Sequence, residues 1–280
     1  MHNPYIVEET ENYAVVFKPA KMHSAMLGEV DSTTNRNLRF LHEPSRTEEK
    51  EQRTLQYWFN QEKGYNKDVR LMHRLDFETH GLVLFAKNEK SFLFFKDIQN
   101  NDEFVKEYSA ICSPHSSLLT PHSSLLTPHS SLLTPNPSLL TPNPSLPTPH
   151  YLEGFPPFPH ENSSVIESYF RPYGPGRKQV RPVIDDGKKH KEIAKDKGGF
   201  YRTEIIVKKE NVFTVRIKRG FRHQIRCHLY WAGFPILNDP LYTCDKTITS
   251  DEQLALRSHA LFFADPASGE RRECRIEPLK

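Results

Sequence analysis

The chain lacks the sequence features of a secreted protein, of a membrane-spanning protein and of a protein held together by bound metal ions. Its N-terminus, MHNPYIVEETENY, has no basic start followed by an apolar run, and apolar stretches such as GLVLFA are far too short to cross a bilayer. No Cys-x-x-Cys pair occurs, which argues against both a disulfide framework and a zinc site. We therefore expect a cytoplasmic protein without a membrane partner, whose thiols are reduced and mostly buried: Cys112, Cys227, Cys244 and Cys274.

A large excess of charge of one sign is also missing. The net charge of +3 and the pI of about 8.5 are only mildly basic, so charge alone says little about a nucleic-acid partner. The distribution is more informative, because Lys and Arg cluster at 171–183, 188–197 and 215–226. Each cluster fits either an RNA contact or an ordinary solvated surface.

A tandem heptad interrupts the chain. The repeat PHSSLLT begins at Pro114, Pro121 and Pro128 and continues as PNPSLLT and PNPSLPT. A proline in every repeat excludes a stable helix, since each costs about 3 kcal/mol inside one. The composition predicts a mobile low-complexity insert at 113–160, including the FPPFP stretch, and the paired leucines leave open a docking site for a partner. Residues 1–112 and 161–280 then form a single domain, which is long enough to bury a core.

Short apolar runs alternate with turn signals in the rest of the chain. Strands are predicted at 13–19, 81–87, 107–111, 201–209 and 211–220, and helices at 54–64, 89–100 and 223–233. The Lys-Glu-Asn turn at 209–211 predicts an antiparallel hairpin. Strands outnumber helices without regular βαβ alternation, so the predicted class is α+β, with a mixed, largely antiparallel sheet.

The segment LMHRLDFETHGLVLFAKN (71–88) places His73, Arg74 and Asp76 in a polar turn before an apolar strand. Rigid scaffolds often present catalytic groups at such an edge. By itself the His-Arg-Leu-Asp string favours a structural role, in which Asp76 caps the turn and is paired with Arg74 or His73.

The whole segment closely resembles the active-site motif of the RluA-type pseudouridine synthase family. That motif runs His-Arg-Leu-Asp, two variable residues, Thr-Ser-Gly, and an apolar strand ending in Ala-Lys. A second block, RGFRHQIRCHLYWAGFPILNDPLY (219–242), resembles the family's Gly-Arg-Thr-His-Gln-Ile-Arg element and its Asp-Pro-Leu-Tyr ending. Weaker likenesses are VVFKPAKMH (15–23), VKEYSAI (105–111) and SHALFFADPASGE (258–270).

The resemblance implies an enzyme that isomerises uridine in RNA to pseudouridine, with Asp76 as the essential catalytic residue. The reaction breaks the N1–C1′ bond, turns the uracil, forms a C5–C1′ bond and removes the C5 proton. No electrons are exchanged, so no redox cofactor is needed and none is expected. A carboxylate is required, but attack at C1′, glycal formation and addition to the ring all remain open.

Two further residues match catalytic positions of the family. Arg226 matches the partner whose guanidinium opposes proton uptake by the buried carboxylate and can orient it through two bonds. Tyr108 matches the tyrosine that packs against the target base and is placed for the late proton transfer. On local sequence alone, Tyr108 is an ordinary half-buried strand residue.

The uridine must leave its stack before C1′ and C5 can be reached. Arg74 is the candidate to support the flipped nucleotide, whereas Lys18 is expected to shape the pocket floor. The other candidates for RNA contact are Arg219, Arg222, His223, Gln224, His73 and Lys218, and the arginines and Lys218 fit a surface charge equally well.

The chain departs from the family pattern at two places. His80 stands where the family has serine, and Phe221-Arg222 replaces Arg-Thr. Neither change touches the proposed catalytic atoms, but both bear on RNA contacts. Strand-like sequence begins by about residue 5, so we expect no separate N-terminal RNA-binding domain and assign RNA binding to the catalytic domain.

Two rival functions remain. A metal hydrolase would use His223 and His228 with Asp239, or Asp76 with Glu78, but the His spacing is poor and no His-Glu-x-x-His pattern occurs. A catalytically inactive RNA-binding protein on the same fold is the stronger rival. We expect no metal, a ribosomal or transfer RNA partner, and a monomer without an obligate protein partner.

Overall fold

The computed structural model describes residues 3–25, 54–64, 69–113, 155–156, 164–184, 200–243 and 252–280. The basic cluster at 188–197, Cys244 and nearly all of the 113–160 insert lie outside these ranges. The helices are α2 (Leu55–Lys63), α3 (Glu89–Asn100) and α4 (Gln224–Trp231), with a short 3-10 turn η2 (Pro175–Arg177). The strands are β1 (Tyr5–Glu9), β2 (Tyr13–Lys18), β3 (Arg70–Leu71), β4 (His80–Ala86), β5 (Val105–Ile111), β6 (Val165–Tyr173), β7 (Gln179–Val183), β8 (Tyr201–Lys209), β9 (Val212–Ile217), β10 (Leu256–Ala264) and β11 (Arg271–Arg275).

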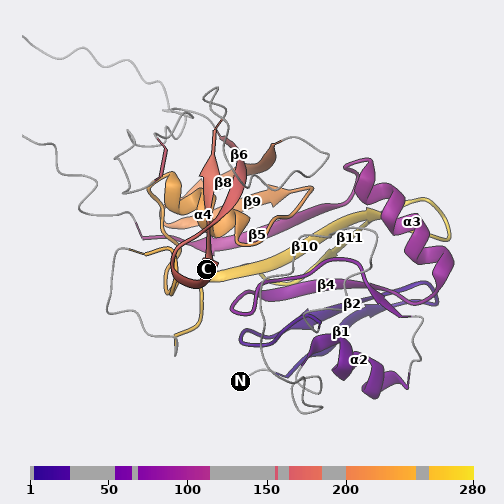
Figure 1. The fold of residues 1–280 in the computed structure, drawn as a ribbon. Helices are drawn as coiled ribbons and strands as arrows, with labels where there is room; N and C mark the ends of the chain where they lie inside the picture. The colour runs from indigo at the N-terminus through magenta and orange to yellow at the C-terminus, as the bar shows by residue number, and fades with distance from the viewer. Residues whose placement is uncertain are drawn as a thin grey trace, which may run out of the picture.

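The described strands form one sheet in the order β1-β2-β4-β10-β5-β9-β8-β6-β7, with β11 added on β10 and β3 on β4 (Figure 1). The β4–β10 pair is parallel, and the other pairs are antiparallel. The predicted α+β class with a mixed, largely antiparallel sheet is confirmed. The predicted hairpin at 209–211 is also confirmed, since β8 and β9 pair antiparallel across it.

Both faces of the sheet are covered where β2 and β4 cross the molecule. Val83 and Phe85 of β4 belong to one buried cluster, which includes Phe59 of α2, whereas Leu82 and Leu84 belong to a second cluster, which includes Phe95 of α3. Successive strand side chains point to opposite faces, so a strand buried on both reads as a continuous apolar run. This explains why polar and apolar residues do not alternate in the sequence GLVLFA.

Two of the three helices begin at a residue whose side chain caps the first turn. The Thr54 hydroxyl accepts from the Tyr57 backbone N–H at 3.1 Å, and the Asn88 amide oxygen accepts from the Ser91 N–H at 2.9 Å. α4 instead starts at His223, whose backbone is left-handed with φ 57°. The helices predicted at 54–64, 89–100 and 223–233 are therefore confirmed to within about two residues at each end.

Two residues from the insert are part of the core. Phe155 is buried and packs edge-on against Tyr230, and the Pro156 carbonyl accepts a hydrogen bond from the Trp231 indole at 2.8 Å. The predicted mobility of 113–160 stays a prediction.

The described cysteines Cys112, Cys227 and Cys274 are free and buried, as predicted. Among the described residues, no helix has the length and apolar character needed to cross a membrane.

Candidate active site

Asp76 lies on a turn whose backbone is held at several points. The Ser24 hydroxyl bonds both the N–H and the carbonyl of Leu75 at 3.1 Å, and the Thr79 N–H donates to the Asp76 carbonyl at 3.2 Å. Leu75 is buried in the core and Phe77 is exposed. The Asp76 side chain between them keeps 23% of its surface accessible, so its carboxylate is fixed in direction yet open to a ligand.

Arg226 reaches this carboxylate from α4. Its side chain is fully buried, and Nη1 lies 3.7 Å from Asp76 Oδ2 and 3.2 Å from Glu78 Oε2. The two-bond contact expected for Asp76 is made with Asp239 instead, at 2.8 Å from Nε and 2.7 Å from Nη2. Arg226 is therefore oriented by Asp239 and turns its remaining nitrogen toward Asp76 and Glu78.

Asp239 is itself fixed by the backbone. Its Oδ1 accepts from the N–H groups of Leu241 and Tyr242 at 2.9 and 3.0 Å. Burial alone would raise the Asp239 pKa, but the Arg226 charge and these bonds lower it. Burial alone would likewise lower the Arg226 pKa, whereas Asp239, Asp76 and Glu78 raise it. The buried pair is thus fully charged at neutral pH.

Tyr108 approaches from the middle of β5. It lies opposite Ser258 of β10, and Ser258 lies opposite Gly81 of β4 on the other side. A Cβ on Gly81 would stand 2.2 Å from the Ser258 carbonyl oxygen, and the Gly81 φ is +122°, so only glycine permits this approach. One strand therefore separates the end of the Asp76 turn from Tyr108.

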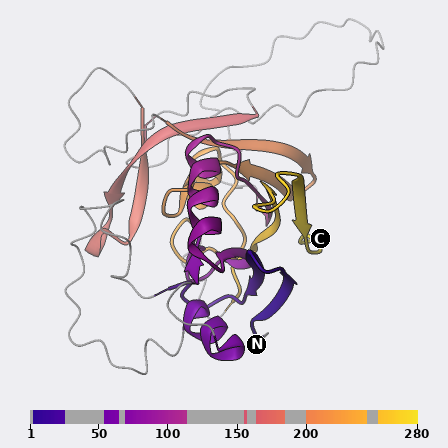
Figure 2. The ribbon, with the colours of Figure 1, turned by 90° about the vertical axis from the view of Figure 1, so that its right-hand side faces the viewer.

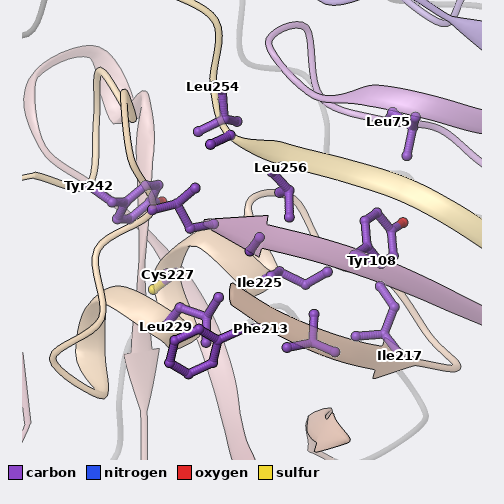
Figure 3. Close-up of a cluster of buried hydrophobic side chains, with 14 of the residues drawn as sticks. Leu75, Tyr108, Phe213, Ile217, Ile225, Cys227, Leu229, Tyr242, Leu254 and Leu256 are labelled. Atoms are coloured by element: carbon purple, nitrogen blue, oxygen red, sulfur yellow. The ribbon is translucent and has the colours of Figure 1, made fainter. Parts of the chain in front are cut away.

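The Tyr108 ring is buried, and Figure 3 shows its hydroxyl turned toward the segment that carries Leu75. Burial raises the Tyr108 pKa, and the nearby negative charge of Asp76 raises it further. The hydroxyl is consequently protonated at neutral pH and can donate a hydrogen bond, but it is a poor base until a ligand changes its surroundings.

Lys18 lies beneath the Asp76 turn with its ammonium held by backbone carbonyls. Nζ donates to the carbonyls of Pro19 at 2.9 Å, Met22 at 2.7 Å and Phe77 at 3.4 Å. Burial lowers its pKa to about 7, against the opposing effect of Asp76 and Glu78. Lys18 thus braces the backbone of the Asp76 turn and has no exposed surface, and its expected place at the floor of a substrate pocket stays a prediction.

The start of α4 brings three more of the predicted residues to the site. His223 Nδ1 lies 3.3 Å from the Tyr242 hydroxyl, and burial lowers its pKa to about 4, so it is neutral near pH 7. Arg222 is exposed and bonds the backbone carbonyl of Gln179 at 3.4 Å. Gln224 is buried and bonds the Thr203 hydroxyl at 3.1 Å, so its amide braces α4 against β8.

Two predicted residues lie apart from Asp76. The His73 ring packs at a tilt against Phe104 and accepts a hydrogen bond from the Leu84 N–H at 3.2 Å. Burial and then the charge of Lys106 lower its pKa. Arg219 forms an exposed ion pair with Asp102 at 2.9 Å.

Arg74, by contrast, reaches the surface beside Asp76. Partial desolvation of its guanidinium lowers the Arg74 pKa, and the Asp76 charge opposes that effect. Asp76, Tyr108, Arg226, Lys18, His223 and Arg74 thus share one region.

Sequence reasoning missed the roles of Asp239 and Glu78, which it considered only as metal ligands. The available signal for Asp239 was its place in the Asn-Asp-Pro-Leu-Tyr block. His228, the other suggested ligand, is buried between the Ser168 and Thr203 hydroxyls at 2.9 Å from each. No group of three or more His, Cys, Asp or Glu side chains suited to a metal occurs in the described part of the chain.

Residues 12–231 match the family model described as RNA pseudouridylate synthase. An uncharacterized protein of Caenorhabditis elegans, K07E8.7, is 30% identical over 179 residues, which are 62% of this chain and 28% of that protein. The uncharacterized RNA pseudouridine synthase YlyB of Bacillus subtilis (strain 168) is 42% identical over 55 residues, 20% of this chain and 18% of that protein. The matches thus span less than a third of either curated relative.

Two human structures share the fold. Human RNA Pseudouridylate Synthase Domain Containing 4 superposes with a TM-score of 0.51 at 16% identity, covering 98% of this chain and 88% of that one. Human RNA Pseudouridylate Synthase Domain Containing 1 gives 0.52 at 16% identity, covering 98% and 83%. At this identity the likeness concerns the fold alone.

Proposed function

The chain belongs to the RNA pseudouridylate synthase family, and on that premise we propose that it isomerises uridine in RNA to pseudouridine, with Asp76 as the catalytic carboxylate. The convergence of Asp76, Arg226 and Tyr108 carries the proposal. The Asp76 carboxylate, whose side chain is 23% exposed, has a fully buried guanidinium 3.7 Å away, and its charge acts on the buried Tyr108 hydroxyl. These groups come from three separate parts of the sequence.

Each group has a distinct part in the proposed reaction. Asp76 supplies the carboxylate needed when the N1–C1′ bond breaks, whether it acts at C1′, at C2′ or on the ring. Arg226 cannot rotate away, because Asp239 holds two of its nitrogens, so its positive charge stays preorganised beside Asp76. Tyr108 lies against the detached uracil and takes part in the removal of the C5 proton after the C5–C1′ bond has formed.

The surface around Asp76 suits a nucleotide that has left its stack. Phe77, next to Asp76, is 40% exposed and packs against the His23 ring at a centroid distance of 4.7 Å. Arg74 is exposed on the same turn. An aromatic face and a guanidinium can support an extruded base and its phosphate. We further expect the substrate to be ribosomal or transfer RNA in the cytoplasm, and the enzyme to act as a monomer.

Release of tritium from 5-tritiated uridine in RNA tests this function. Total RNA from cells lacking the gene, labelled at uridine C5, is incubated with the purified wild type, with Asp76→Asn and with Glu78→Gln. The wild type should release tritium, and Asp76→Asn should slow release by a factor on the order of a thousand or more. Glu78→Gln is the matched control, since Glu78 shares the Arg226 contact but is not assigned to chemistry.

The outcomes separate the possible functions. RNA binding without tritium release by the wild type would indicate an inactive RNA-binding protein. Full activity of Asp76→Asn would refute the role of Asp76 and leave the family assignment intact. Equal losses in both variants would show that the assay reports charge near Arg226 and not catalysis by Asp76.

A further inference from the structure

The part of β6 that pairs with β7 forms an arm together with β7 and the turn between them, residues 168–183. The arm contains Arg171, Arg177, Lys178 and Arg181 and no acidic residue, and the acidic residue of β6, Glu167, precedes it and forms an ion pair with Arg202. Figure 2 shows the arm standing to one side of the remaining strands. Its tip, Gly174 to Lys178, turns through positive φ angles at Gly174, Gly176 and Arg177, and Arg177 and Lys178 are exposed there. The arm thus presents positive charge on a defined backbone.

The arm is fastened to the rim of the active site. The Arg222 guanidinium donates to the carbonyls of Arg177 at 2.5 Å and Gln179 at 3.4 Å. The Tyr242 hydroxyl accepts from the Val180 N–H at 2.7 Å. Tyr242 also lies against His223 and donates its own N–H to Asp239, the residue that orients Arg226. Contacts therefore run without a break from the arm to the catalytic carboxylate.

Part of the positive charge on the arm is not neutralised by the described residues. Within these residues, neither Arg171 nor Lys178 forms an ion pair. Arg171 lies directly opposite Arg181 in the β6–β7 register, so two arginines are brought together on the arm.

Aromatic rings are interleaved with these charges. The Arg181 guanidinium stacks on the ring of Tyr173, which is 36% exposed. Tyr169 stacks against Phe200, which is 46% exposed, with ring centroids 4.4 Å apart. Alternating cations and exposed rings match the phosphates and bases of a nucleic-acid strand better than they match an acidic protein surface.

We propose that the β6–β7 arm holds the sugar-phosphate backbone of the RNA next to the target uridine. This inference rests on the proposed function for the identity of the ligand. The arm is assigned to substrate binding, so loss of its charge should weaken the binding of RNA and reduce the salt dependence of that binding.

Fluorescence anisotropy with a fluorescein-labelled stem-loop RNA carrying uridines in its loop tests the arm directly. The variant is Arg171→Gln with Lys178→Gln. The matched control is Lys90→Gln with Arg271→Gln, which removes one exposed lysine and one exposed arginine from α3 and β11. The arm variant should bind about tenfold more weakly, and its slope of log K against log salt should fall by about 1.5. The control should shift Kd less than about twofold.

A second variant guards against a folding artefact. Lys178→Gln alone changes one exposed side chain at the tip and should give about half the change in slope. An unchanged Kd and slope in both arm variants would overturn the inference and leave the proposed function untouched. The inference would also be overturned if the control variant weakened RNA binding as much as the arm variant does. If RNA binding depends on the arm but the wild type releases no tritium, the proposed enzymatic activity is refuted and the proposed role of the arm in RNA binding is supported.

Discussion

Replacing Asp239 with asparagine is the most informative perturbation of the site. The side chains of Arg226 and Asp239 are both fully buried and share two hydrogen bonds of 2.8 and 2.7 Å. Asn keeps one oxygen for the backbone N–H groups of Leu241 and Tyr242 but loses the charge and the second acceptor. The amide NH2 group of the asparagine would then face the Arg226 N–H groups, so that hydrogen-bond donors would meet without an acceptor between them.

The magnitude follows from the burial of Arg226. Removing one partner of a buried ion pair costs about 3–5 kcal/mol in stability, because the remaining charge is left buried without a partner. Glu78 still contacts Arg226 at 3.2 Å, so we expect the lower limit, a loss of about 3 kcal/mol in the free energy of unfolding. Glu78→Gln removes a partner that is 28% exposed and should cost about 1 kcal/mol or less.

Urea unfolding followed by tryptophan fluorescence measures the stability, since Trp231 belongs to the same helix as Arg226. Single-turnover tritium release measures the effect on the site, and we expect a loss of about 10- to 100-fold as Arg226 leaves its orientation. An Asp239→Asn protein within 1 kcal/mol of wild type and within twofold of its rate would refute this reasoning. Arg226 would then not depend on Asp239.

Three further predictions concern the sheet and its buried charges. Gly81→Ala should cost about 3 kcal/mol or more in unfolding free energy, because the new Cβ meets the Ser258 carbonyl. Gly220→Ala, whose Cβ would have ordinary contacts, is its control in urea unfolding, and equal losses would contradict the steric argument. Tyr108→Phe should change stability by less than about 1.5 kcal/mol yet slow tritium release at saturating RNA, and an unchanged rate would remove Tyr108 from the chemistry. The pKa of Lys18 is lowered to about 7 and that of Lys106 to about 8 from the ordinary 10.5, so the unfolded chain binds more protons than the folded one. Stability should therefore rise by about 2 kcal/mol from about pH 7 to about pH 8.5, and a urea midpoint that falls over this range would contradict both assignments.

The elements with regular apolar patterns were predicted from the sequence, whereas β6 and β7 were not. Residues 171–183 were described only as a basic cluster, although they form the arm. Pro172, Gly174, Pro175 and Pro182 interrupt the strand pattern. Pro182 is tolerated because β7 lies at the edge of the described sheet, and Pro172 because β6 pairs with β8 only over Val165–Ser168. Local propensity therefore gave little indication of strands that are held by Arg222 and Tyr242 from elsewhere in the chain.

The candidate catalytic residues came from motif resemblance, and their neighbours required the structure. His73 and Arg74 are adjacent in sequence, yet His73 is packed against Phe104 while Arg74 is exposed near Asp76. The partner of Arg226 was not predictable either, because Asp239 reaches it from a loop beyond the end of α4. Pairings of this kind depend on loop geometry, which neither periodicity nor spacing encodes.

The position of β10 has a consequence for how the protein is made. This strand, residues 256–264, lies between β4 and β5, whose sequences emerge from the ribosome far earlier. During synthesis β4 and β5 each expose an unpaired edge, which invites contact with other chains until β10 arrives. The pairing that brings Asp76 near Tyr108 is thus among the last to form. Such long-range closure predicts slow folding, and a nascent chain halted before residue 256 should be prone to aggregate.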